Sequence, residues 1–273
     1  MKVLVTGSSG YIGQHLCAFL KSKQHEVWGL DNTFGDETYI DEFRCIDITN
    51  QNDLIAGCWN DITFDAVIHL AALVQVGESV KDPLHYYQTN IQGTINCMKY
   101  ISYDNFVFAS TGAAAAPTSP YAISKFAAEQ CVRQYLNDVP YTIFRFYNVI
   151  GSAGYEPTNP DGLFYNLMKA ERTGQFNLYG DDYSTPDGTA IRDYVHVTDI
   201  CRAHIHAYRY LENKGAQRIV SAVLVDKDLG REKPYRADHI GLVTENRYLF
   251  GFGLDYKGYL RNWPGIYACR TVY

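Results

Sequence analysis

Cysteine pairs, long apolar runs and clusters of basic residues are all missing from this sequence. The seven cysteines are dispersed, odd in number and form no CxxC motif, so we expect reduced thiols rather than disulfides, and no metal site. No stretch has the length and apolarity of a membrane-spanning helix, and Met1-Lys2 leads directly into a strand-like run rather than a signal peptide. We therefore expect a cytoplasmic protein with no membrane partner.

The charge balance argues against a second group of functions. The net charge is −6 and the basic residues are scattered, whereas a nucleic-acid or anionic-membrane surface needs them gathered on one face. An apolar fraction of 47% with 20% charged residues is typical of a globular protein. The 273 residues suffice for one large domain, or for one domain with a smaller companion.

The order of the predicted elements favours an α/β fold. Short apolar runs alternate with helical patterns, which is typical of a parallel sheet covered on both faces. Right-handed crossovers then give a doubly wound, Rossmann-like arrangement. The predicted strands are residues 2–6, 27–30, 43–46, 66–70, 106–109 and 141–146, and the predicted helices are residues 14–20, 51–58, 84–100 and 121–136.

The pattern changes at Asn148. Residues 148–195 are rich in Gly, Pro, Asn, Asp and Tyr, which predicts loops that shape a polar pocket. A helix is predicted at 197–211, and strand candidates follow at 219–225 and 248–254. We therefore divide the chain into a Rossmann domain (1–147), a partial substrate-binding region or truncated substrate lobe (148–214), and a short β-rich tail (215–273).

Three glycines follow the first predicted strand and open a helix. Gly7, Gly10 and Gly13 let backbone amides approach a pyrophosphate, and the helix N-terminus favours its negative charge. Asp31 ends the second strand, where a carboxylate binds ribose hydroxyls and repels a 2′-phosphate. The pattern predicts NAD rather than NADP; the alternative is an ordinary turn in a chain with 22 glycines.

Residues at the ends of the next strands extend the predicted cofactor site. Asp47 and Ile48 follow the third strand and could contact adenine, although a carboxylate that caps the next helix is a nearly equal alternative. Leu70-Ala71-Ala72 end the fourth strand, where small residues let a dinucleotide lie close to the sheet. His69 is interpreted as a buried structural histidine.

Tyr121 and Lys125 carry the predicted chemistry. Residues four apart lie on one face of a helix, and a nearby ammonium favours the phenolate, which is scarce at pH 7 because an ordinary tyrosine pKa is near 10. With Ser110-Thr111 upstream, a phenolate beside a hydroxyl donor can take a proton from an alcohol while hydride leaves its carbon. Tyr165/Lys169 and Tyr210/Lys214 share the spacing; we interpret them as surface helix residues.

These motifs in this order resemble the extended short-chain dehydrogenase/reductase family, and further stretches make residues 1–214 similar to its UDP-glucose 4-epimerases. The stretches are Val76-Gly77-Glu78-Ser79-Val80, Arg145-Phe146-Tyr147-Asn148, Asn166-Leu167-Met168 and Pro186–Val197. The resemblance implies NAD as the cofactor and a UDP-sugar as the substrate, and it leaves a homodimer open. It adds Tyr11, Ile12 and Asn90 to the cofactor contacts, and it assigns the substrate to Asn148, Asn166, Leu167 and Arg192.

The resemblance also implies a reaction. Tyr121 deprotonates the sugar 4-hydroxyl while NAD+ takes hydride from C4; the ketose turns over, and hydride returns to its opposite face. Lys125 holds the nicotinamide ribose and lowers the pKa of Tyr121, while Thr111, supported by Ser110, hydrogen-bonds the reacting oxygen. Arg192 makes charge-assisted contacts to the diphosphate.

Three departures from the family's pattern leave two alternatives open. The segment between Ser110 and Tyr121 is short, Val74 stands where these epimerases usually have a lysine, and the family's C-terminal lobe does not continue past about Gly215. A catalytically impaired NAD- or nucleotide-binding fusion protein is one alternative. A nucleotide-sugar dehydratase is the other, although Gly112-Ala113 replaces the acidic pair that this chemistry usually has after the threonine.

The tail, residues 219–268, resembles the C-terminal part of hypoxanthine-guanine phosphoribosyltransferase. The resemblance implies purine contacts at Lys227, Tyr248 and Asp255 and a pyrophosphate contact at Arg261. The sequence has no apolar strand that ends in paired acids and a small-residue loop, which that family needs for phosphoribosyl pyrophosphate, so we expect no such activity. We interpret the tail as an edge strand and hairpin added to the sheet.

Overall fold

The computed structural model describes residues 1–57, 62–160, 162–178, 180–189 and 192–214, and four strands beyond them. Side chains are described through residue 207. The chain divides into two compact units, Met1–Arg218 and Ile219–Tyr273. The finer division at residues 147 and 148 stays a prediction.

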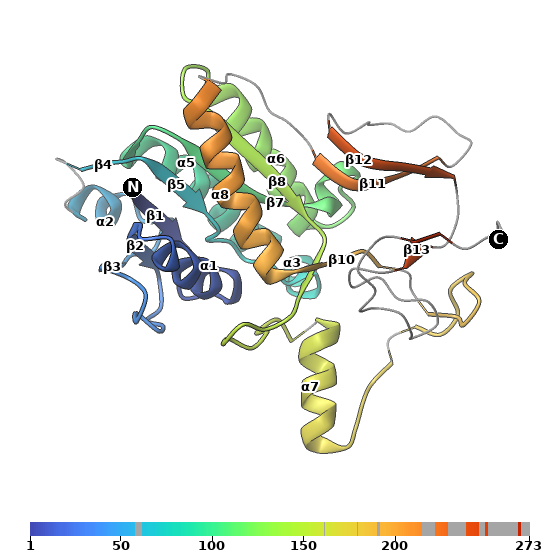
Figure 1. Ribbon diagram of the computed structural model, residues 1–273. Coiled ribbons are helices and arrows are strands. Elements are labelled where there is room, and N and C mark those ends of the chain that lie inside the picture. The colour runs from blue at the N-terminus through green and yellow to red at the C-terminus, as the bar shows by residue number, and fades with distance from the viewer. Residues whose placement is uncertain are drawn as a thin grey trace. The chain divides into compact units, whose positions relative to one another are not determined.

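A six-stranded parallel sheet forms the centre of the first unit (Figure 1). Its order is β3-β2-β1-β5-β7-β8, and every pair is parallel. The strands are β1 (Lys2–Thr6), β2 (Glu26–Asp31), β3 (Glu42–Cys45), β5 (Ala66–His69), β7 (Phe106–Thr111) and β8 (Tyr141–Phe146). The predicted doubly wound sheet is confirmed. Its strand order reverses between β1 and β5, and ligands bind such sheets at the carboxyl ends of the strands beside that point.

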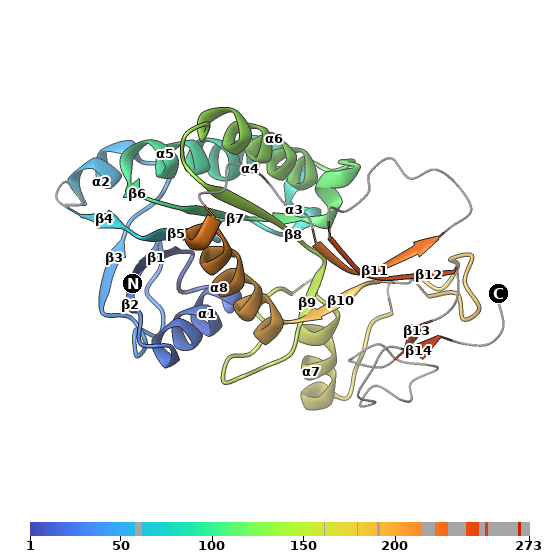
Figure 2. The same cartoon turned by 45° about the horizontal axis from the view of Figure 1, so that its top comes forward.

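Helices cover both faces of the sheet. Figure 2 shows α4, α5 and α6 over one face and α1 and α8 over the other. The helices of this unit are α1 (Tyr11–Ser22), α2 (Gln51–Ala56), α3 (Val76–Lys81), α4 (Pro83–Tyr87), α5 (Gly93–Tyr100), α6 (Pro120–Tyr135), α7 (Leu163–Thr173) and α8 (Val197–Lys214). Val5 from β1, Leu16 from α1 and Cys201 from α8 share one buried apolar cluster. Each fully buried side chain of valine or leucine size contributes about 1.5–3 kcal/mol.

The helix predicted at residues 84–100 is interrupted. A π-helical turn, η1 (Gln88–Gln92), separates α4 from α5. It carries Asn90, whose buried side chain reaches the main chain of Leu73. Apolar spacing alone does not reveal a single widened turn, so the sequence predicted one continuous helix; such turns are frequent at functional sites.

Residues 148–195, predicted as loops, also contain regular structure. β9 (Asn148–Ile150) pairs with β10 (Tyr194–His196) in a parallel ladder. α7 begins after Gly162 and ends at Gly174, which has a φ of 70°. These two glycines are sequence signals for the ends of a helix.

Short elements complete the chain. They are β4 (Thr63–Phe64), β6 (Ser102–Tyr103), the 3₁₀ turn η2 (Gly112–Ala115), β11 (Ala222–Asp228), β12 (His239–Glu245), β13 (Leu249–Phe250) and β14 (Tyr267–Ala268). β11 and β12 pair in parallel, and β13 and β14 pair antiparallel. β11 and β12 are therefore not themselves a hairpin, because a hairpin joins antiparallel strands; the interpretation of the tail as an edge strand and hairpin stays a prediction. Lys227 lies in β11, and Tyr248, Asp255 and Arg261 lie outside the described residues.

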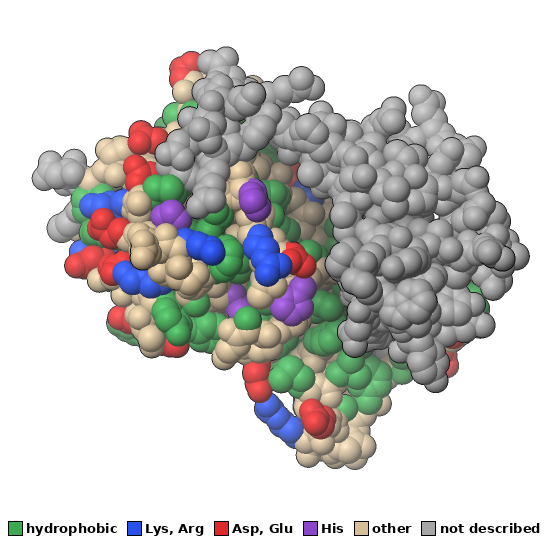
Figure 3. Space-filling view, in the orientation of Figure 1, with side chains coloured by type: hydrophobic (Ala, Val, Ile, Leu, Met, Phe, Trp, Pro, Cys, Tyr) green, Lys and Arg blue, Asp and Glu red, His purple; other side chains and the backbone are tan. Residues whose placement is uncertain are grey.

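The surface of the described residues has two plain features. On the face seen in Figure 3, acidic and basic side chains are interspersed rather than segregated by sign. None of the helices within the described ranges is both long and apolar enough to span a bilayer.

Candidate functional site

A cleft of about 1200 Å³ opens at the carboxyl ends of the parallel strands. Ligand sites in α/β proteins commonly occupy this position. The predicted site residues that line it are Gly7, Gly10, Tyr11, Ile12, Gly13, Asp31, Asp47, Ile48, Leu70, Ala71, Ala72, Ser110, Thr111, Tyr121, Lys125, Asn148 and Arg192. The fold therefore brings residues that are far apart in the sequence, from Gly7 to Arg192, around the same cleft.

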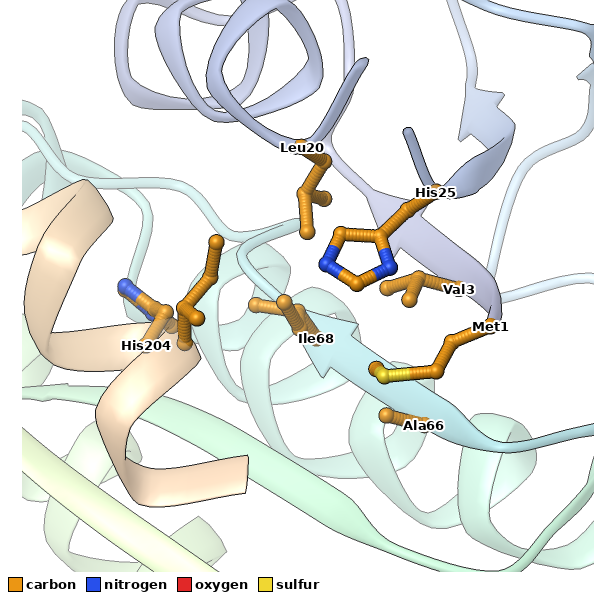
Figure 4. A pocket seen from close by; sticks show the side chains of 8 residues that line it. Met1, Val3, Leu20, His25, Ala66, Ile68 and His204 are labelled. Carbon is orange, nitrogen blue, oxygen red and sulfur yellow. The ribbon is translucent and has the colours of Figure 1, made fainter. Parts of the chain in front are cut away.

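A second, much smaller cavity lies in the apolar core (Figure 4). It has a volume of about 10 Å³ and is lined by Val3, Leu20, Ile68 and His204, among others. That volume holds at most about one water molecule. Because no predicted site residue lines it, we interpret it as a packing gap.

The glycine loop brings two stretches of main chain into contact. Gly7 has a φ of +73°, and a Cβ atom there would lie 2.7 Å from the amide nitrogen of Ala71. A Cβ atom on Gly13 would lie 2.1 Å from the carbonyl oxygen of Gly7. Only glycine fits at either position, so the turn from β1 into α1 passes directly against the end of β5.

The N-terminus of α1 lies at the cleft, and no acidic side chain of its first turn offsets its partial positive charge. Its N-cap is Gly10, no side chain caps its amides, and its first turn has no acidic residue. The partial positive charge of the helix is therefore available to an anion. This arrangement fits a pyrophosphate.

Asp31 is held in place at the end of β2. The Ser9 N–H donates to its Oδ2 (3.0 Å), while the N–H and hydroxyl of Thr33 both donate to its Oδ1 (3.1 Å each). A carboxylate oxygen keeps lone pairs after one or two such bonds. Asp31 can therefore still accept from ribose hydroxyls, and its fixed charge opposes a 2′-phosphate.

α6 positions the tyrosine and lysine. The hydroxyl of Ser119 accepts the N–H of Ala122 (3.2 Å) and Pro120 occupies the first turn, so the helix starts just before Tyr121. Lys125 follows one turn later, with its Nζ 4.5 Å from the centroid of the Phe108 ring, a cation–π distance.

The pKa values of the pair move in opposite directions. Burial raises the pKa of Tyr121, and a hydrogen bond from Thr111 offsets part of that rise. Burial lowers the pKa of Lys125 to about 7, against the opposing charge of Glu129. In this structure the lowering contribution to Tyr121 comes from Thr111; the contribution expected of Lys125 stays a prediction.

His69 is buried and bonded on both ring nitrogens. Its Nδ1 lies 2.8 Å from the Thr6 hydroxyl and its Nε2 lies 3.0 Å from that of Thr94. Thr94 donates to the carbonyl oxygen of Asn90 (2.7 Å), so the Nε2–H of His69 donates to Thr94. Burial, with the Lys125 charge, lowers the pKa of His69 to about 3. A neutral imidazole held in this way supports the structural interpretation.

Three predicted site residues do not line the cleft. Asn90 accepts the N–H of Leu73 (2.8 Å) and donates to the Leu73 carbonyl (3.0 Å) and the Ser124 hydroxyl (2.9 Å). Asn166 donates to the carbonyl oxygens of Pro160 and Gly162 (2.7 and 3.0 Å), and Leu167 is exposed on α7. Their ligand contacts stay predictions.

Two further residues of the site, Tyr147 and Glu129, are not among those predicted from the sequence. Tyr147 lines the cleft, and its ring lies on Gly112, where a Cβ atom would be 2.5 Å from a ring carbon. Glu129 is fully buried behind Ser110. Tyr147 stands within a stretch that carried the resemblance, and Glu129 continues the four-residue spacing of Tyr121 and Lys125, so both signals were present.

Comparison with known proteins gives the family. Residues 3–222 match the NAD dependent epimerase/dehydratase family. The chain belongs to this family.

Individual relatives narrow the comparison. The chain is 34% identical to UDP-glucose 4-epimerase of Schizosaccharomyces pombe, with 86% of this chain and 81% of the relative covered by the alignment. It is 33% identical to UDP-glucose 4-epimerase of Mus musculus, with 78% and 74% covered. Among solved structures, a UDP-glucose 4-epimerase of Stenotrophomonas maltophila with bound NAD and formylated UDP-arabinopyranose superposes with a TM-score of 0.69 at 29% identity, covering 80% of this chain and 76% of that one.

Proposed function

We propose that this chain is a NAD-dependent UDP-glucose 4-epimerase that inverts C4 of the sugar by transient oxidation and re-reduction. The observation that carries the proposal is the gathering of Tyr121, Lys125 and Thr111 in one cleft with the glycine loop, with Tyr121 and Lys125 one turn apart on α6. NAD, when bound, would provide the acceptor and donor of the hydride. Tyr121 accepts the proton of the 4-hydroxyl and gives it back, while Thr111 holds the reacting oxygen.

The residues for the cofactor come from the carboxyl ends of β1, β2 and β5. Gly7, Gly10 and Gly13, with the adjoining Tyr11 and Ile12, would hold the pyrophosphate through main-chain amides. Asp31 would bind the adenosine ribose, with Asp47 and Ile48 beside the adenine. Lys125 would bind the nicotinamide ribose. The fixed Asp31 carboxylate favours NAD over NADP.

The pairing of β9 with β10 supports residues 148–214 as the part that binds the nucleotide-sugar. Tyr194 pairs with Asn148, and the Asn148 side chain donates to the Asp193 carbonyl (2.9 Å). This ladder brings Asn148 beside the segment that carries Arg192. Both residues line the cleft, where the guanidinium can contact a diphosphate.

The test is the interconversion of UDP-glucose and UDP-galactose by the purified chain. Tyr121→Phe should lower the rate by about 100- to 10,000-fold, the usual worth of a general acid–base group, and should still bind NAD. Tyr135→Phe, which alters an exposed tyrosine of the same helix, is the matched control. NAD binding without turnover in the wild type would support the impaired-fusion alternative, and a 4-keto-6-deoxy product would identify a dehydratase.

We further propose a cytoplasmic homodimer. Exposed apolar side chains gather on α3, α4 and α6, which pack against one another; they are Val80, Leu84, Ile123 and Phe126. Apolar surface shared by adjacent helices is typical of an interface, and a second copy of this chain would cover it. Leu84→Glu should turn a dimer into a monomer in sedimentation velocity; a wild type that sediments as a monomer would contradict the proposal.

A further inference from the structure

Glu129 continues the catalytic spacing of α6 into the interior of the protein. It lies one turn beyond Lys125 and two turns beyond Tyr121, and its side chain has no exposed surface. A buried carboxylate is costly unless it is paired and hydrogen-bonded. The partners of Glu129 therefore indicate why an acid stands there.

Neighbouring strands supply those partners. Ser110 in β7 and Arg145 in β8 face each other in the sheet register, and both reach Glu129. Arg145 donates from Nε (2.8 Å) and from an Nη (2.6 Å), one bond to each carboxylate oxygen. Arg133, on the same helix, lies 3.5 Å from Oε2. Burial alone would raise the pKa of Glu129, but Arg145, Ser110 and Arg133 together hold it below its ordinary value.

An ionised carboxylate can only accept hydrogen bonds, which fixes the direction of the contact with Ser110. The Ser110 hydroxyl lies 2.5 Å from Oε1 of Glu129, so it is the donor. Because Ser110 uses its one hydroxyl proton in the bond to Glu129, it can only accept hydrogen bonds from groups in the cleft. Thr111 accepts the N–H of Ala113 (3.3 Å) through its oxygen, so its proton stays available on the side of the cleft that Tyr121 lines.

The charge of Glu129 also acts on Lys125. Burial disfavours the ammonium, and Glu129 opposes that effect. The other charged or titratable groups around this pair are Arg133 on the same helix, Arg145 on β8, His69 on β5 and Tyr121. The pKa of His69 is lowered to about 3, so His69 is neutral and adds no positive charge beside Lys125. Glu129, one turn further along α6, supplies the opposing negative charge.

We propose that Glu129 is a positioning residue of this site: it turns the Ser110 hydroxyl inward, leaves Thr111 as the hydroxyl donor on the cleft side, and supplies a counter-charge to the Lys125 ammonium. The proposal rests on the proposed epimerase function. It assigns Glu129 no contact with substrate or cofactor.

Glu129→Gln tests the proposal because it keeps the shape and removes the charge. We expect kcat to fall about 10- to 100-fold while KM for the UDP-sugar stays within about twofold. The basic limb of the pH–rate profile should also move down by about one pH unit, because the Lys125 ammonium loses its counter-charge and gives up its proton at lower pH. The same shift should appear in NAD+ binding measured by calorimetry across pH, which needs no turnover. Lys125→Met should abolish this pH dependence.

Ser110→Ala separates the two roles of Glu129, because it leaves the pair with Arg145 intact. It should lower kcat without moving the basic limb, and the effects of Ser110→Ala and Glu129→Gln on kcat should be less than additive. Glu37→Gln, in an exposed loop after β2, is the matched control and should change nothing.

A purely structural Glu129 would give a different result. Glu129→Gln would then lose thermal stability and folded yield, while kcat per folded molecule and both pH profiles matched the wild type; that outcome overturns the proposal. If the wild type converts no UDP-sugar, the epimerase function fails, and the pH dependence of NAD+ binding still tests the link between Glu129 and Lys125.

Discussion

The hydroxyl of Tyr11 donates a hydrogen bond to the carbonyl oxygen of Gly151, 140 residues further along the chain. Two more bonds join the same regions. The Ala153 N–H donates to Nε2 of His15 (3.0 Å), and the Tyr155 hydroxyl donates to Asp36 (2.9 Å). The start of α1 and the loop after β2 are thus tied to the segment that follows β9. The proposed cofactor side and the proposed sugar side of the cleft share this contact.

Tyr11→Phe should weaken this tie without removing the ring. One hydrogen bond contributes about 0.5–1.5 kcal/mol, so we expect the free energy of unfolding in urea to fall by that amount. Because the segment after β9 continues from Asn148, UDP affinity should fall more than NAD affinity. Calorimetric titration with each ligand measures the difference, and equal losses would show that the tie does not favour the sugar side.

Gly13→Ala should abolish NAD binding. Its Cβ would lie 2.1 Å from the Gly7 carbonyl oxygen, so the loop must move away from β5. Gly77→Ala is a matched control, because a Cβ there has no neighbour within 4 Å and Gly77 lies in α3. The control should be neutral or stabilising, by up to about 1 kcal/mol. NAD retained by Gly13→Ala would contradict this account of the loop.

Thr111→Val should move the acidic limb of the pH–rate profile upward. The hydrogen bond from Thr111 lowers the pKa of Tyr121, so its loss raises that pKa and the phenolate forms only at higher pH. The rate at pH 7 should fall more than the rate at pH 9. Thr118→Val, at an exposed position before α6, should leave the profile unchanged. A uniform loss at every pH would indicate that Thr111 acts on the substrate alone.

Stability should decrease as the pH falls below about 6.5, the ordinary histidine pKa. Burial lowers the pKa of His204 to about 4 and, with the Lys125 charge, that of His69 to about 3. Between pH 6.5 and these values the unfolded chain binds protons that the native protein does not, so each group lowers the free energy of unfolding by about 1.4 kcal/mol per pH unit.

His204→Phe isolates one of these groups. The ring of His204 packs against both Phe144 and Phe146, with centroid distances of 5.1 and 5.5 Å, so a phenyl group suits its surroundings. The free energy of unfolding in urea, measured at pH 7.5, 6 and 5, should fall less steeply with falling pH than in the wild type. The difference should correspond to the uptake of about one proton. His206→Gln, on the exposed face of α8, is the comparison. Equal slopes for wild type and His204→Phe would contradict the prediction.

The fold was largely predictable because its signals are local. Val3 to Val5 and Ala66 to Ile68 are buried on both faces of the sheet, and such strands appear in a sequence as unbroken apolar runs. Gly7 and Gly13 were recognisable because a tight turn after a strand needs glycine. Asp31 was recognisable because it places a carboxylate at the end of a strand.

The remainder depended on contacts between distant residues. Asn90 looks like any polar helix residue until the π-helical turn carries it to Leu73. Tyr11 was expected at the cofactor, but its hydroxyl reaches Gly151, and no local pattern indicates that partner. The parallel pairing of β11 with β12 was missed for the same reason, since strand direction is set by the connection and not by the strand.

The floor of the cleft is main chain, because Gly7 and Ala71 approach too closely to admit a side chain between them. No side chain lies between these two residues, so a substitution at Gly7 cannot change the shape of the cleft there without disrupting the turn. Elsewhere the cleft is lined by side chains, among them those of Val74, Tyr147 and Arg192, which stand on separate segments. Substitutions of these side chains can change the shape and charge of the cleft, while the main-chain contact between Gly7 and Ala71 stays as it is.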